Sequence, residues 1–282
     1  MTAPGAQVSG DRVAIKVPGG TMPVSVIGDG PPVLLLHGIS ANHTEWLPVA
    51  RLLSRRYRVI MPDLLGRGDS SPEPGARYAL ADETQRIALV LQALGVQRPS
   101  VAGHSHGATL ALALASQVPC RRIVLLSPVT PWTKRPRALD ALRWPVLRSA
   151  LLPIVGICRR PLTRYILTRR VYGDRRPDIE SAVLRYSEPY TDQSRAQALL
   201  QILADWQPAH VGRLTVPQGI PVHVATGGQD RRIAVEHVTQ WADVLGAEFT
   251  LAPGAGHGLT EERPELCAQL VSDGGGGELI CQ

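Results

Sequence analysis

VAGHSHGAT, residues Val101 to Thr109, follows an apolar run and leads into the helix-like ATLALALA of residues 108–115. A serine between two glycines at such a junction is the sequence form of a nucleophile elbow, a tight strand-to-helix turn that holds the serine Oγ clear of its neighbours. Gly103 and Gly107 provide this clearance because they carry no side chain. Ser105 is therefore a candidate nucleophile, provided that the rest of the chain supplies a matching fold, a base and an acid.

Short β-like runs rich in Val, Leu and Ile alternate with helical patterns. The β-like runs are 12–16, 21–27, 32–36, 57–61, 100–102, 121–126, 222–225 and 248–251, and the helical patterns are 46–53, 81–94, 107–116, 235–245 and 262–271. Such alternation predicts a mostly parallel sheet covered by helices on both faces. We therefore predict an α/β fold with an eight-stranded sheet flanked by helices.

The alternation breaks once, between Pro128 and about Gly212, where the chain is helix-like, Arg-rich and interrupted by prolines. This break predicts a helical cap inserted after the sixth strand. The expected division is a first core part in residues 1–129, the Arg-rich cap in 130–212, a second core part in 213–272 and a flexible Gly-rich tail in 273–282.

The charge of the chain is concentrated in this predicted cap. Residues 131–176 hold twelve Lys or Arg against Asp140 and Asp174, a net charge of +10 that leaves −4 for the rest. No nucleic-acid-binding module is recognisable among them, so we expect no nucleic-acid partner. The arginines could steer an anionic substrate or contact a membrane surface. The alternative without a binding role is that they form the solvated exterior of a cap whose inner side is apolar.

The remaining composition favours a cytoplasmic enzyme without a metal. The first ten residues have no apolar core of a signal peptide, and the longest nearly uncharged apolar run, 150–158, is too short to cross a bilayer. The four cysteines are scattered without paired spacing, which argues against a zinc site and a disulfide framework. The oligomeric state is left open.

A base and an orienting acid follow late strands in the order that a Ser nucleophile of this kind requires. Asp230 ends the Gly-rich turn TGGQD after the run 222–225, and His257 lies in the loop APGAGHG after the run 248–251. The loop after the run 121–126 reads SPVT and offers no competing acid. We predict Ser105, Asp230 and His257 as the catalytic residues.

Tetrahedral intermediates also need two backbone N–H donors. One comes from the residue after the nucleophile, which is His106, and the other from a loop after an early strand, where Gly38 allows a turn that aims the Ile39 amide. His37, Trp132 and Trp144 are the candidates for substrate contact.

Five motifs follow one another in the chain: His37-Gly38, DLLGRGDS from Asp63 to Ser70, the Ser105 elbow, GGQD ending at Asp230, and GAGH ending at His257. In this order they resemble the α/β-hydrolase superfamily over about residues 12–272. Two departures are Ala108, where many members have a second glycine, and His106, which replaces the commoner Met, Leu or Gln.

The resemblance implies a serine hydrolase that cleaves a carboxylic ester or thioester through an acyl-enzyme, with no metal or organic cofactor. Ser105 at the elbow argues against haloalkane and epoxide hydrolases, because relatives with those activities have an aspartate at the nucleophile position. Acyl transfer and C–C bond hydrolysis on the same residues stay open as alternatives, although Gly258 stands where C–C hydrolases commonly have an aromatic residue. A non-catalytic ligand-binding protein is the rival of another class.

Overall fold

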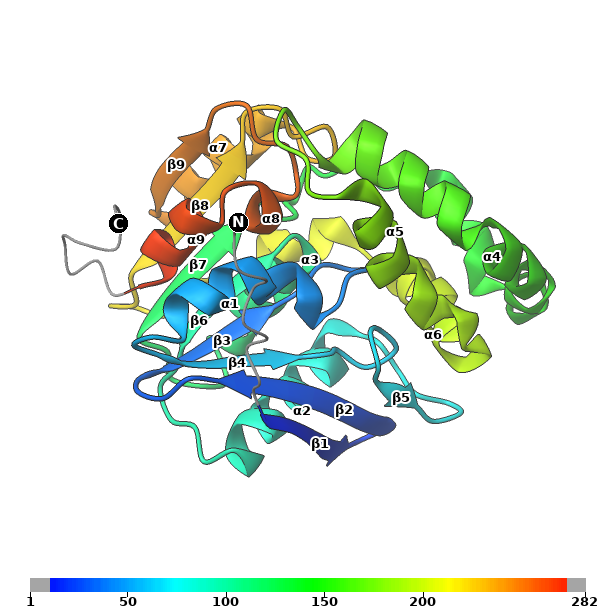
Figure 1. The fold of residues 1–282 in the computed structure, drawn as a ribbon, viewed down its shortest axis with the longest axis horizontal. Helices are drawn as coiled ribbons and strands as arrows, with labels where there is room; N and C mark the ends of the chain where they lie inside the picture. Colours follow the sequence, from blue (N-terminus) through cyan, green and yellow to red (C-terminus); the bar gives the residue numbers. More distant parts are fainter. Residues whose placement is uncertain (1–10, 273–282) are drawn as a thin grey trace, which may run out of the picture.

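A nine-stranded sheet runs through the protein in the computed structural model, which describes residues 11–272 (Figure 1). The strand order is β1-β2-β4-β3-β6-β7-β8-β9, and the short β5 pairs with β2. The strands are β1 Asp11–Val17, β2 Gly20–Ile27, β3 Pro32–Leu36, β4 Arg58–Pro62, β5 Ser71–Pro72, β6 Ser100–His104, β7 Arg122–Leu126, β8 Val222–Gly227 and β9 Glu248–Ala252.

The sheet confirms the predicted α/β class. β1 and β2 are antiparallel to their neighbours, whereas β3, β4, β6, β7, β8 and β9 are parallel. All eight predicted strands are present, and β5 is the additional one. Its two residues are too few to give an alternating pattern in the sequence, so it could not be predicted from periodicity.

Helices cover both faces of the sheet because successive strand residues point to opposite sides. Leu34 and Leu36 of β3 pack with α2 Leu80–Ala93, α3 His106–Leu114 and α7 Val235–Leu245. Val33 and Leu35 pack with α1 Leu47–Leu53, α8 Leu259–Glu262 and α9 Pro264–Val271.

Two predicted helices differ in detail from the observed ones. The predicted helix 262–271 corresponds to α9, and the short α8 that precedes it was not predicted. The two are separate at Arg263 because Pro264 cannot continue the hydrogen bonds of α8 and instead begins α9. The helix predicted from Trp46 begins with a 3₁₀ turn at His43–Trp46, where the Asn42 side chain accepts the Thr44 N–H.

Between β7 and β8 the chain forms what we call the helical insertion, residues 137–213. Its elements are η2 Arg137–Arg143, α4 Pro145–Ile166, a π-helical turn Leu167–Val171, α5 Ile179–Ser187, η4 Glu188–Thr191, α6 Gln193–Asp205 and η5 Pro208–Arg213. Leu151, Leu152 and Val155 of α4 pack near Leu200 and Ala204 of α6. In Figure 1 α4 is the outermost helix on its side of the molecule.

The predicted division into core and cap stays a prediction, since helix positions alone do not establish separate domains. The predicted tail, 273–282, lies outside the described residues.

Candidate active site

Ser105 occupies a strained turn between β6 and α3. Its φ of 54° and ψ of −113° are unusual for a residue with a side chain, and such strain is found where a fold holds a functional group in place. A Cβ added at Gly103 would strike the Gly107 backbone, and one added at Gly107 would strike the Leu36 carbonyl. Both glycines are therefore required by the close approach of α3 to β6 and β3.

Asp230 holds the ring of His257. The Nδ1 of His257 lies 2.8 Å from Asp230 Oδ2. The other carboxylate oxygen of Asp230 accepts the backbone N–H groups of Arg232 and Ile233 at 2.8 and 3.0 Å. With a carboxylate at Nδ1, the neutral imidazole carries its proton there and presents Nε2 as a base.

Burial and charge shift the pKa values of this pair in the direction that a neutral base needs. Burial lowers the pKa of His257 below 6.5, and this effect outweighs Asp230, which raises it. Burial raises the pKa of Asp230, but the His257 ring and the backbone donors lower it further, so its net pKa lies below 3.8. Asp230 is thus charged and His257 neutral near pH 7.

A second buried histidine lies against His257. The ring centroids of His104 and His257 are 4.9 Å apart, and His104 Nε2 lies 2.8 Å from the His257 carbonyl oxygen. His104 Nδ1 is 3.3 Å from the buried carboxylate of Glu45, which also accepts the Gly38 N–H at 3.0 Å. Burial lowers the pKa of His104, but Glu45 raises it more, so the net pKa is above 6.5. No sequence pattern indicates the His104–Glu45 pair, because the two residues lie 59 positions apart without a shared motif.

The Ile39 loop lies beside the elbow. A Cβ added at Gly38 would be 3.7 Å from Ser105 Cβ, so this loop and the candidate nucleophile are neighbours. Among the described residues, no hydrogen bond is made by the backbone N–H of Ile39 or of His106. These two amides are the ones that the sequence predicts as oxyanion donors, and both are available.

One buried ion pair, Arg67–Glu83, connects Ile39 with His106. Arg67 donates from Nε to the Ile39 carbonyl oxygen at 3.1 Å, and its NH1 forms an ion pair with Glu83 Oε1. Glu83 Oε2 lies 2.8 Å from His106 Nε2. Arg67 and Glu83 are almost wholly buried, so the pair holds both sides of the predicted oxyanion hole from behind.

His37 is placed inside the protein and not at a surface that a substrate could reach. It is fully buried, and Leu64 N–H donates to its Nε2 at 3.0 Å, which leaves Nδ1–H to donate to the Gly38 carbonyl oxygen at 2.8 Å. Burial lowers the pKa of His37 to about 4, consistent with a neutral ring. Both ring nitrogens serve the backbone of the loop, and substrate contact at His37 stays a prediction.

The two predicted substrate-contacting tryptophans lie at α7 and at the start of α4. Trp132 packs against His237 and Trp241 of α7, with ring centroids 6.1 and 6.2 Å away. Trp144 is 72% exposed and precedes α4. Neither has a described contact with Ser105, Asp230 or His257, so substrate contact at these residues stays a prediction.

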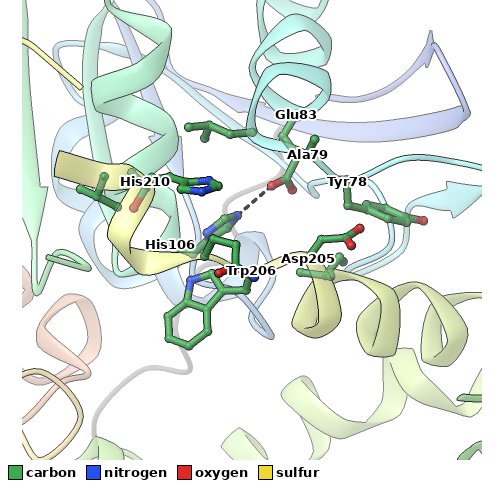
Figure 2. A pocket seen from close by; sticks show the side chains of 12 residues that line it. Tyr78, Ala79, Glu83, His106, Asp205, Trp206 and His210 are labelled. Carbon is green, nitrogen blue, oxygen red and sulfur yellow. Dashed lines mark hydrogen bonds and ion pairs between the residues drawn. The ribbon is translucent and has the colours of Figure 1, made fainter. Parts of the chain in front are cut away.

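A pocket of about 280 Å³ lies beside His106, between α2, α3, α6 and η5 (Figure 2). Its walls include Tyr78, Glu83, His106, Asp205 and Trp206, whereas the three predicted catalytic residues are not among them. His106 Nδ1 and Thr109 Oγ1, both buried, are without a partner, so a bound group could supply one.

The His257 loop is tied to the helical insertion. The backbone carbonyl of Val171, the last residue of the π-helical turn, accepts the His257 N–H at 2.6 Å. Gly173 N–H donates to Glu262 at 2.8 Å, and Tyr172 Oη donates to Glu261 at 2.6 Å. The position of the candidate base thus depends on the insertion as well as on the sheet.

Within residues 11–272, no group of three or more His, Cys, Asp or Glu side chains is arranged to hold a metal ion.

Comparison with known proteins places these features in context. Residues 33–270 match the family model described as "Alpha/beta hydrolase family". A Rhodobacter capsulatus protein named "Magnesium-chelatase 30 kDa subunit" is 41% identical over 259 residues, which are 87% of this chain and 87% of that protein. A Pseudomonas putida 2-hydroxy-6-oxo-2,4-heptadienoate hydrolase is 33% identical over 165 residues, 57% of this chain and 56% of the relative.

Among solved structures, an alpha/beta hydrolase fold protein from Burkholderia ambifaria superposes with a TM-score of 0.80 at 22% identity. The match covers 94% of this chain and 100% of that protein, so the two share the whole fold.

Proposed function

This chain belongs to the alpha/beta hydrolase family, and on that premise we propose that it is a serine hydrolase that cleaves a carboxylic ester or thioester. The observation that carries the proposal is the buried Asp230–His257 pair on loops that follow β8 and β9, combined with Ser105 on the strained turn before α3. An activated serine needs a base whose ring is oriented by an acid, and this pair provides both.

In the proposed reaction, Ser105 Oγ attacks the acyl carbonyl carbon while His257 Nε2 takes the hydroxyl proton. The Ile39 and His106 amides stabilise the negative charge that develops on the carbonyl oxygen. His257 then gives its proton to the leaving alcohol or thiol, and the acyl group stays on Ser105. A water molecule, deprotonated by His257, releases the acid and restores the serine.

The pocket beside His106 favours a substrate that carries a neutral hydrogen-bonding group. With His106 Nε2 directed at Glu83, its Nδ1 is free to form a hydrogen bond with a substrate group, and Thr109 Oγ1 can donate or accept. The carboxylates of Glu83 and Asp205 would disfavour an anion at this position. We therefore expect a hydroxyl group on an otherwise apolar body, and we place any anionic group of the substrate elsewhere.

Two relatives suggest alternatives. Because the Pseudomonas putida relative is named a 2-hydroxy-6-oxo-2,4-heptadienoate hydrolase, C–C bond hydrolysis by the same residues is a second candidate reaction. The name of the Rhodobacter capsulatus relative suggests a subunit of a larger enzyme, for which hydrolysis by this chain would not be needed.

Covalent labelling with a fluorophosphonate, followed by intact mass and peptide mapping, tests the proposal. We expect one label on Ser105, no label on a Ser105→Ala variant, and full labelling of a Ser116→Ala variant, which alters an exposed serine past the end of α3. Turnover of p-nitrophenyl esters of increasing chain length would then define the acyl site. Absence of labelling in the folded protein would overturn the proposal in favour of a non-catalytic subunit.

A further inference from the structure

Helix α4 exposes an apolar face that the rest of the protein leaves uncovered. None of its 22 residues is fully buried. Val146 is 82% exposed and Ile157 is 79% exposed, and Ile154, Leu162 and Tyr165 are each more than half exposed. In Figure 1 the helix lies at the edge of the molecule, with α5 and α6 on its inner side only.

These exposed side chains form one stripe. Val146, Ala150, Ile154, Ile157 and Pro161 follow one another at spacings of three or four residues, and all are exposed. Residues at such spacings share one face of a helix. The other large exposed apolar residues within 11–272, such as Val13, Leu184, Val244 and Leu251, are spread over separate elements. A continuous apolar stripe on a surface marks an interaction site.

The inner side of α4 is already used by the fold. Leu151, Leu152 and Val155 pack with the cluster that α6 and η2 form, and they are all partly covered. The helix therefore has two apolar sides, one against the protein and one against solvent. The outer side needs a partner outside the described part of the chain.

Charge identifies the kind of partner. From Arg143 to Val171 the chain has seven arginines and no Asp or Glu. Arg160 and Arg164 are paired with Glu188 and Glu180 from neighbouring elements. Arg143 and Arg169 are exposed and take part in no ion pair among the described residues. An apolar stripe beside unpaired arginines complements a surface that is apolar inside and negatively charged at its boundary.

We propose that α4 lies along the surface of a membrane that contains anionic lipids, with the stripe of Val146, Ile154 and Ile157 in the acyl boundary and the arginines at the headgroups. Trp144 at the start of the helix and Tyr165 near its end, both exposed, fit the polar–apolar boundary because their rings are amphipathic. Helices of this composition lie in the plane of the interface. The inference rests on α4 alone and holds whether or not Ser105 is a nucleophile.

No single helix in the described residues is long and apolar enough to cross a bilayer; only η2 and the continuous helix from Pro145 to Val171, at 110° to each other, pass that test together. The proposal is therefore a helix on the surface and not a span.

Flotation of the purified protein with vesicles tests the proposal. We expect it to float with vesicles of phosphatidylcholine mixed with phosphatidylglycerol, to bind pure phosphatidylcholine at least about tenfold more weakly, and to lose affinity as salt is raised. Failure of the wild-type protein to float with the mixed vesicles would overturn the proposal.

Variants assign the binding to α4. Ile154→Asp with Ile157→Asp removes two exposed apolar side chains that would enter the acyl boundary, and should weaken binding by more than about a hundredfold. Val244→Asp, at an exposed apolar position of α7, is the matched control and should bind like the wild type. Circular dichroism and the thermal midpoint confirm that both variants are folded.

Arg143→Glu with Arg169→Glu should reduce binding to the mixed vesicles and leave binding to pure phosphatidylcholine unchanged. Arg55→Glu with Arg56→Glu, exposed in the turn after α1, is the control for net charge. Equal binding by the isoleucine variant and the wild type would overturn the proposal. So would a wild-type dimer in sedimentation that Ile157→Asp dissociates without any effect on vesicles, since the stripe would then join two copies of the chain.

Discussion

Burial and neighbouring charges, His104 among them, determine the pH at which the candidate base can act. Burial lowers the pKa of His257, and the neighbouring His104, whose own pKa is raised by Glu45, lowers it further. Because the base must be neutral to take a proton, the acid limb of kcat/KM should lie below pH 6.5.

In a His104→Asn variant, loss of the positive charge should raise the pKa of His257 and move the acid limb to higher pH. Profiles of kcat/KM against pH on a neutral ester measure this. His223→Asn, whose ring lies beside Glu248 and Thr250, is the control and should leave the limb in place. An unmoved limb in His104→Asn would show that His104 only supports the loop.

Glu83 supports the predicted oxyanion hole through its contacts with Arg67 and His106. A Glu83→Gln substitution removes the charge that compensates the buried Arg67, and such losses cost about 3–5 kcal/mol. We expect a lower urea midpoint and, because His106 and Ile39 lose a common support, a lower kcat with little change in KM. Asp82→Asn, at a partly buried position that is paired with Arg77 in the first turn of α2, should alter stability by less than about 1 kcal/mol. Equal effects of the two substitutions would contradict this role for Glu83.

The site residues that can be predicted from the sequence are those that lie in short local motifs. Ser105 lies between glycines, and Asp230 and His257 lie in Gly-rich turns after apolar runs. Glu45, His104, Glu83 and Arg67 act through partners that only the fold brings together. A contact between residues many positions apart leaves no spacing pattern to detect.

At the scale of elements, two glycines in helices predict opposite responses to alanine. A Cβ at Gly107 would strike the Leu36 and His37 carbonyls and push α3 away from β3, at a cost of about 1–3 kcal/mol. A Cβ at Gly156 of α4 meets nothing within 4 Å, so Gly156→Ala should stabilise the helix by about 0.5–1 kcal/mol.

Thermal and urea unfolding of both variants measure the difference, and Gly107→Ala should also lose fluorophosphonate labelling because the elbow moves. A fully stable and reactive Gly107→Ala protein would contradict the close packing of α3 on β3.

The helical character of the insertion could be predicted from the sequence, whereas the direction and packing of its helices could not. Periodicity in residues 137–213 indicates helices, whereas the direction of α4 is set by packing of Leu151, Leu152 and Val155 on a helix about fifty residues later. The exposed face of α4 could not be foreseen, since an apolar residue in a helix is ordinarily a core residue.

For the whole molecule, buried groups with lowered pKa values predict a loss of stability in acid. The pKa of His37 is lowered by burial from 6.5 to about 4. Burial raises the pKa of Glu83, but Arg67 and His106 lower it further, from 4.5 to about 2. In each case the unfolded chain binds protons before the folded one does, so the stability contribution is complete above the unfolded pKa and is lost as pH falls toward the folded pKa.

The free energy of unfolding in urea should therefore begin to fall near pH 6.5 and fall more steeply below pH 4.5. His37→Asn should make the decline between pH 6.5 and about 4 shallower, and it should leave the contribution of His257 and the part below pH 4 in place. A flat profile across this range for the wild type would contradict the buried, neutral state of His37.

The α/β class and the eight longer strands follow from alternating apolar and helical runs, because burial favours apolar residues in strands throughout the chain. The site of the two-residue β5 and the split of α8 from α9 depend on single residues, and these were the parts that periodicity missed.

The contacts of Val171 and Gly173 with the His257 loop bear on how this protein can be re-engineered. A chimera that takes its helices from a relative would lose the acceptor of the His257 N–H unless it kept the native junction at residues 171–173. Helices α4 to α6 are thus not an exchangeable module, and recombination points belong before the π-helical turn and after Gly173.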